Sequence, residues 1–223
     1  MTTAVVAATS KRAHPALRRA VRGAGWTLVA AGALVLYFLV YQLVGTNAIT
    51  AQAQRSLVRQ LRHAWHEPRA LTPVRPVLGQ PFAVIDIPKL QLEEVLIYGV
   101  RPQDLRKGPG HEPWTAMPGQ AGTFGVSGHR TTFLAPFFYL NHLKAGNEVK
   151  IITSTHVYTY AVTTSRVVSP SDGAVMNAVR RPGGGLEHRI ALTTCTPLYS
   201  AAQRLVVFGR LVAVGANNGA VAA

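Results

Sequence analysis

The sequence contains a single cysteine, Cys195, among 223 residues. One cysteine excludes an intramolecular disulfide framework and every metal site that needs several cysteines. If the domain lies outside the cell, its core alone must stabilise it. The cysteine ends the apolar run RIALTTC and precedes Pro197 by two residues. Its position in the chain therefore raises the question of what it does.

Charge is also scarce, since 14% of the residues are charged and 48% are hydrophobic. A soluble globular chain averages about 25% charged residues, so the composition indicates a membrane segment. The net charge is +14, and much of the excess lies in two stretches, residues 1–25 and 55–76. Because these stretches flank an apolar segment, we interpret them as contacts for anionic lipid head groups or a polyanionic wall, and we expect no nucleic-acid binding.

No charged residue occurs between Gly23 and Gln54. Within this span, the nineteen residues Trp26–Val44 are long enough to cross a membrane as a helix. Five basic residues precede the span, and the positive-inside rule then predicts a cytoplasmic amino terminus and an extracellular remainder. The alternative is a signal peptide cleaved after the small-residue motif at 51–53.

The segment after the anchor combines a helical pattern with prolines. Leu57, Leu61 and Trp65 recur at helical spacing, which predicts a short amphipathic helix lying on the membrane surface or packing on the following domain. Four prolines between 68 and 81 then favour an extended spacer. We place the domain boundary near Gln80. The predicted organisation is a cytoplasmic tail (1–22), an anchor (23–48), an extracellular stalk (49–80), a catalytic domain (81–214) and a tail (215–223).

Seven short runs of β-type residues, separated by turn residues, follow Gln80. None of the intervening segments is long enough to form the helix of a βαβ crossover, so the pattern predicts an all-β antiparallel sandwich or a small closed barrel. A long connection, 169–187, precedes the cysteine run.

Alternation along RIALTTC places Cys195 on the strand face opposite the large aliphatic side chains. A cysteine that only fills a core would lie among those side chains, so this pattern favours a nucleophile. A nucleophilic thiolate needs a basic or cationic neighbour. Among the histidines, His129 in GTFGVSGHR has the same strand-end setting with small neighbours, whereas His111 is expected to be an exposed loop residue.

Acyl transfer also needs a donor at the developing oxyanion. Arg204 follows Cys195 by nine residues, after a loop that contains Pro197 and Ser200. Two antiparallel strands joined by this loop would bring Arg204 level with Cys195. Spacing alone leaves open that this arginine only extends its charge to solvent.

The motifs GVSGHR, TTCTP and RLVVFGRL, in this order, together with the segment KGPGHEPWTAMPGQAGTFGVSGHRTT that contains the first of them, resemble the sortase family of membrane-anchored cysteine transpeptidases. The resemblance covers about residues 82–213, and TTCTP is most similar to class E sortases of high-GC Gram-positive bacteria. It implies a closed eight-stranded β-barrel with short helices, preceded by one transmembrane helix, and a catalytic site of His129, Cys195 and Arg204.

The resemblance also implies the reaction and its partners. The substrate would be a surface protein with an LPXTG-type or LAXTG-type sorting signal, cleaved between Thr and Gly through a Cys195 thioester. The acceptor would be the amine of a lipid-linked peptidoglycan precursor or of a pilin. Thr194 and Tyr199 are expected to contact the substrate because they lie near Cys195.

Some features separate this chain from other sortases and enzymes. The nine acidic residues show no cluster that would bind calcium, so we expect no metal and no cofactor. The segment before Phe82 lacks the aromatic and acidic lid motif of pilus-assembling sortases, which disfavours that alternative. TTC lacks the glycine that an L,D-transpeptidase would have before its cysteine. A catalytically inactive membrane-anchored binding module is the remaining alternative.

Overall fold

The computed structural model describes residues 15–66 and 76–219. The chain divides into two units, Met1–Gln42 and Leu43–Ala223. In the first unit, helix α1 (Pro15–Val40) is long and apolar enough to cross a membrane, and its side chains are exposed. A single π-helical turn, η1 (Tyr41–Gly45), follows it.

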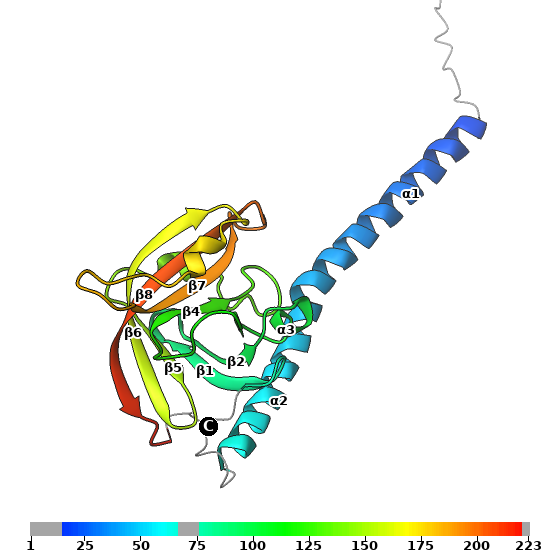
Figure 1. Cartoon of the computed structure of the whole chain (residues 1–223). Coiled ribbons are helices and arrows are strands. Elements are labelled where there is room, and N and C mark those ends of the chain that lie inside the picture. The colour runs from blue at the N-terminus through cyan, green and yellow to red at the C-terminus, as the bar shows by residue number, and fades with distance from the viewer. Residues whose placement is uncertain (1–14, 67–75, 220–223) are drawn as a thin grey trace, which may run out of the picture. The chain divides into compact units, whose positions relative to one another are not determined.

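The second unit contains a barrel of eight strands (Figure 1). The strands are β1 (Pro81–Ile87), β2 (Leu92–Tyr98), β3 (Gly110–His111), β4 (Gly122–Ser127), β5 (Glu148–Ile152), β6 (His156–Val168), β7 (His188–Thr196) and β8 (Gln203–Ala216). The helices are α2 (Thr46–His66), α3 (Pro102–Leu105) and the 3₁₀ turns η3 (Pro88–Leu90), η4 (Leu140–His142) and η5 (Gly173–Met176).

The strand order around the barrel is β1-β2-β3-β4-β7-β8-β6-β5, and β5 pairs with β1 to close it. The closed barrel confirms the predicted fold class. The purely antiparallel pattern is wrong for two pairs, because β2 with β3 and β4 with β7 are parallel. The hairpin of β5 and β6 separates β4 from β7 in sequence, so a parallel pair forms without a crossover helix. This pairing places the ends of β4 and β7 at the same edge of the barrel.

The barrel interior is filled by alternate residues of the strands, as the period-2 pattern predicts. Ile85, Leu96, Phe124, Ile190 and Leu192 are among its fully buried side chains. Residues between them face outward, and several are covered by other segments. Val206 and Phe208 of β8, for example, pack outside the barrel with Val175 and Met176 around η5.

Helix α2 packs along β1 and β2 (Figure 1). Leu57 and Leu61 are buried against Val84, Val95 and Ile97 of these strands. Of the two expectations for this amphipathic helix, packing on the domain is therefore the one observed. The compact unit begins at Leu43, which differs from the boundary near Gln80, because the helical face that looked suited to a lipid surface covers the barrel wall.

A buried glutamine joins α2 to the barrel. The Gln54 side-chain amide donates to Lys107 O at 2.7 Å and to Val95 O at 3.3 Å, and its oxygen accepts from Val95 N at 2.8 Å. A Cβ on Gly108 would lie 2.1 Å from Gln54 Nε2, and Gly108 has φ +153°. Glycine at this position therefore allows the loop to approach the helix.

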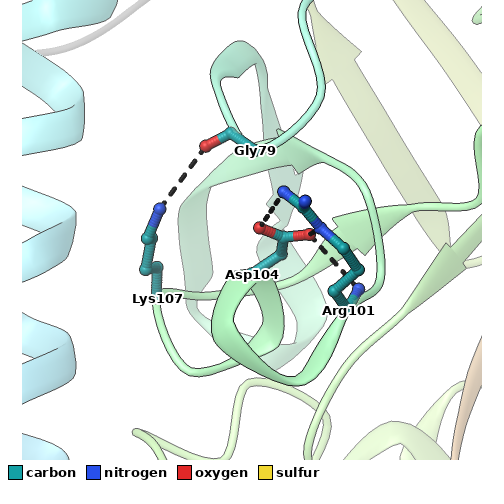
Figure 2. Close-up of polar contacts among 4 residues, drawn as sticks. All are labelled: Gly79, Arg101, Asp104 and Lys107. Atoms are coloured by element: carbon teal, nitrogen blue, oxygen red, sulfur yellow. Dashed lines mark hydrogen bonds and ion pairs between the residues drawn. The ribbon is translucent and has the colours of Figure 1, made fainter.

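The segment around α3 is held by a buried carboxylate (Figure 2). Asp104 accepts from Arg101 Nε at 2.8 Å and from Arg101 N at 3.2 Å, closing the first turn of the helix. Lys107 Nζ lies 3.5 Å from Gly79 O. These contacts fix the segment that carries Arg106, a residue near the candidate site.

His111 is buried, which makes the expectation of an exposed loop residue wrong. It lies in β3 and stacks on Phe124 at 4.7 Å, beside Phe82 and Tyr98. Its Nδ1 donates to Gly125 O at 3.0 Å, while Nε2 is buried and has no hydrogen-bond partner in the part of the chain that the structure describes. The turn-rich sequence around it concealed a two-residue strand, and burial lowers the pKa of His111 to about 4.

We expect His111→Phe to remove part of the acid sensitivity of folding. The histidine pKa is about 4 in the folded chain and near 6.5 when unfolded. Its stabilising effect is thus complete above pH 6.5 and is lost as the pH falls toward 4, by about 2–3 kcal/mol. Urea unfolding at pH 7 and pH 4 measures this loss. Equal losses in the wild type and in His111→Phe would contradict the assignment.

Glu94 has the opposite pH dependence. Its Oε2 is buried with no hydrogen-bond partner within residues 15–66 and 76–219, and burial raises the pKa of Glu94 from 4.5 to about 7. The folded chain therefore loses stability as the pH rises from 4.5 through 7. We expect Glu94→Gln to be about 2 kcal/mol more stable than the wild type at pH 8, and equal to it at pH 4.5. Urea unfolding at both pH values tests this, and an equal effect at both would reject a role for ionisation.

Candidate active site

The ends of three adjacent strands bring the predicted catalytic residues to one edge of the barrel. In the antiparallel pair of β7 and β8, Cys195 lies directly opposite Arg204. In the parallel pair of β4 and β7, Ser127 lies opposite Thr193, and Gly128 N donates to Thr193 O at 3.0 Å. His129 follows Ser127 by two residues, just beyond the end of β4, and Cys195 follows Thr193 by two residues near the end of β7. All three predicted catalytic residues thus lie toward this edge of the barrel.

Cys195 lies on the outer face of β7. The alternate residues Ile190 and Leu192 point into the barrel core, whereas Ala191 packs outside it. The half-buried cysteine is a free thiol on the side of Ala191. This orientation confirms the alternation read from RIALTTC.

His129 is half-buried and stacks on Phe133, with 4.9 Å between the ring centroids. Phe133 in turn lies under the Arg106 guanidinium, whose Cζ is 6.0 Å from the ring centroid. Burial lowers the pKa of His129, and the positive charge of Arg106 lowers it further. The neutral imidazole, which can accept a proton, is favoured as a result.

The loop after His129 has an unusual backbone. Three consecutive residues, Phe133, Leu134 and Ala135, have positive φ angles of 54°, 63° and 47°. Residues other than glycine rarely adopt positive φ angles, so contacts with neighbouring segments must maintain this backbone conformation. One such contact comes from α2, where Asn47 Oδ1 accepts from Leu134 N at 2.8 Å. Helix α2 therefore contributes to the position of the loop that carries the His129 stacking partner.

Arg204 is half-buried and directs its guanidinium to the loop between β7 and β8. Nη1 donates to Ala201 O at 3.0 Å and to Gln203 O at 3.1 Å. These carbonyls hold the side chain beside Cys195 at the edge of the barrel, where a substrate carbonyl oxygen could replace them as acceptor.

Comparisons with known proteins identify the family of the chain. The family model for the sortase domain matches residues 85–212. The chain belongs to the sortase family. The sortase SrtE1 of Streptomyces coelicolor is 32% identical over 205 residues, which are 86% of this chain and 57% of that protein. Sortases are cysteine transpeptidases associated with membranes, and they act on proteins that bear a sorting signal.

Solved sortase structures have the same fold. The crystal structure of sortase E1 from Streptomyces coelicolor with a tripeptide in the active site has a TM-score of 0.60 and 32% identity, and it covers 66% of this chain and 98% of that one. A sortase D5 transpeptidase of Clostridium perfringens has a TM-score of 0.63 and 28% identity, covering 73% of this chain and 99% of that one. This sortase is thus similar to class E enzymes, as its TTCTP motif indicates.

The two residues expected to contact the substrate have different environments. Thr194 of this sortase is 2% exposed, and its hydroxyl donates to Gly128 O at 2.8 Å, so it secures the backbone before His129. Tyr199 is 78% exposed in the loop between β7 and β8, with φ 63°. Thr194 is thus a buried residue beside Cys195 that contacts the backbone before His129, whereas Tyr199 lies on the surface.

A buried arginine next to His129 had no assigned role in the sequence interpretation. Arg130 is 7% exposed, and its Nη1 donates to Cys195 O at 3.2 Å and to Thr196 Oγ1 at 2.9 Å. The signal was present in GHR, but a strand-end arginine is usually solvated, and only the tertiary fold shows that this one turns inward.

A polar cluster lies on the same outer face, two residues before His129 on one strand and two residues before Cys195 on the other. Ser127 Oγ donates to the carboxylate of Glu112. The second Glu112 oxygen and Thr193 Oγ1 are buried and have no hydrogen-bond partner among the described residues. Burial raises the pKa of Glu112, an effect that the hydrogen bond from Ser127 reduces. Sequence alone did not identify Glu112, because it lies in a turn-rich segment far from β4 in the pattern.

An apolar groove of about 390 Å³ adjoins the loop after His129. It contains none of the three catalytic candidates. Its lining residues are Leu90, Leu92, Leu134, Ala135, Pro136, Phe138 and Tyr139. In the part of the chain that the structure describes, no three His, Cys, Asp or Glu side chains gather to bind a metal ion.

Proposed function

We propose that this sortase cleaves a carboxy-terminal sorting signal of LAXTG or LPXTG type between Thr and Gly and joins the new carboxyl end to an amine. The observation that carries the proposal is the position of Cys195 directly opposite Arg204 in the pair of β7 and β8, with His129 just beyond the end of the adjacent strand β4. The tripeptide in the active site of the sortase E1 relative supports a peptide substrate.

In the first step, the Cys195 thiol gives its proton to His129, and sulfur attacks the threonine carbonyl carbon. A C–S bond forms, and the carbonyl oxygen becomes an oxyanion that the Arg204 guanidinium stabilises. The C–N bond to glycine then breaks, and the His129 imidazolium protonates the departing amine. The product is a thioester on Cys195.

In the second step, an acceptor amine attacks the thioester carbonyl. His129 removes a proton from the attacking nitrogen, an amide bond forms, and the C–S bond breaks to return the thiolate, which recovers a proton from His129. The acceptor that we propose is the amine of a lipid-linked peptidoglycan precursor. A pilin amine is the alternative acceptor.

Helix α1 bears on where in the cell the enzyme acts. We propose that it anchors the chain with a cytoplasmic amino terminus, because five basic residues precede its uncharged part, and that the barrel faces outward. Substrate and lipid-linked acceptor would then be held at the same membrane face, which raises their effective concentration.

The test is mass spectrometry of the full chain in detergent micelles with LAXTG and LPXTG peptides and an amine acceptor. We expect a ligated product in which the residues after Thr are replaced by the acceptor, and the preferred peptide identifies the signal. A folded chain that forms no product with either peptide would favour a binding module.

A further inference from the structure

Arg130 connects three segments of the site. Its Nη1 reaches Cys195 O and Thr196 Oγ1 at the end of β7, at 3.2 Å and 2.9 Å. Its Nη2 donates to Asn141 Oδ1 at 2.9 Å in η4. Because Arg130 follows His129 directly, these bonds fix the end of β4 against the end of β7.

The charge of Arg130 is buried without a carboxylate partner. The residue is 7% exposed, and no acidic side chain of the described residues forms an ion pair with it. A buried cation without a counter-ion is unfavourable. Burial lowers the pKa of Arg130, whereas the neighbouring Cys195 raises it.

The other charged groups near Cys195 are less suited to hold a thiolate. Arg204, opposite Cys195 on β8, donates to the loop carbonyls of Ala201 and Gln203, and among the described residues none of its guanidinium hydrogen bonds reaches β7. The pKa of His129 is lowered by burial and by Arg106, so its cationic form is disfavoured. Glu112 is hydrogen-bonded to Ser127, which precedes His129 by two residues. Arg130 keeps its charge at neutral pH, and one of its acceptors is the backbone carbonyl of Cys195 itself.

We propose that Arg130 is a positioning residue that fixes the end of β7 and provides the permanent positive charge beside the Cys195 thiolate, while Arg204 serves the substrate oxyanion. This inference rests on the proposed function, since it assigns the Cys195 thiolate to one arginine of that site and the substrate oxyanion to the other. The two roles are separable because one acts on the free enzyme and the other on the acylation step.

The pH dependence of Cys195 alkylation tests the proposal. Cys195 is the single cysteine of the chain, so iodoacetamide reports on this thiol alone. In the full chain in micelles, we expect Arg130→Met to move the midpoint of the rate–pH curve upward by about one pH unit and to slow alkylation at neutral pH about 10-fold. Arg130→Lys, which keeps the charge, should recover most of the shift.

Two control variants separate charge from structure. Thr196→Val removes one hydrogen-bond acceptor of Arg130 and leaves its charge, so its midpoint should stay within about 0.3 unit of the wild type. Arg204→Met should lower transpeptidation and leave the alkylation midpoint in place. A folded Arg130→Met with the wild-type midpoint overturns the proposal.

A large upward shift in Arg204→Met overturns the proposal as well, and this comparison decides the matter if Arg130→Met does not fold. Failure of the proposed function is a different result. It would appear as a wild-type chain without ligation product, whereas alkylation needs no substrate and reports on Arg130 in either case.

Discussion

Replacing Cys195 with alanine is expected to abolish peptide ligation, lowering the rate by at least about 10³-fold. The variant has no sulfur to form the thioester, and no other cysteine exists in the chain to replace it. The rate of product formation from a sorting-signal peptide and an amine, followed by mass spectrometry, provides the measurement.

Stability should be almost unchanged in this variant, because Cys195 is half-buried on the outer face and forms no part of the barrel core. The loss of activity can then be assigned to chemistry. Thr193→Ala, on the same face two residues earlier, is the matched control and should retain ligation within about 10-fold. Ligation by the alanine variant at the wild-type rate would exclude a thioester mechanism.

Leu61→Ala in α2 is expected to destabilise the folded chain by about 2–5 kcal/mol. Leu61 is 3% exposed and packs with Leu57 on Val84 and Val95, so truncation leaves a cavity between helix and barrel. Since a domain is stable by about 5–15 kcal/mol in total, the loss is a large fraction. Urea unfolding followed by tryptophan fluorescence measures it.

Ile49→Ala is the matched control on the same helix, because Ile49 is 55% exposed and should change stability by less than about 1 kcal/mol. Equal effects of the two substitutions would mean that α2 does not pack on the barrel. A chain that starts at Gln80 should show a still larger loss, because it lacks both leucines and the Gln54 bonds to the segment before β3.

The sequence predicts the strands well because alternation has a direct physical cause. Residues such as Ile190 and Leu192 must fill the barrel, and the residues between them, including Cys195, must then face outward. The same pattern identifies the strand ends that carry His129 and Arg204. Alternation alone predicted either a sandwich or a closed barrel. The family resemblance carried by the order of the motifs implied the barrel.

Features formed by long-range contacts were not predictable from local pattern. His111 lies among glycines and prolines, which indicate a loop, yet pairing with β2 and β4 makes it a buried strand residue. Arg130 and Glu112 depend on which segments the barrel places against them. The packing of α2 was undecided, because an apolar helical face suits a membrane surface and a protein surface equally.

The most direct test of the central claim is the intact mass of the full chain after incubation with an LAXTG or LPXTG peptide without an amine acceptor. The proposed function predicts an adduct equal to the peptide up to its threonine acyl group, located on Cys195 by fragmentation and released by hydroxylamine. A folded chain that carries no such adduct, or carries it on another residue, would contradict catalysis by a Cys195 thioester.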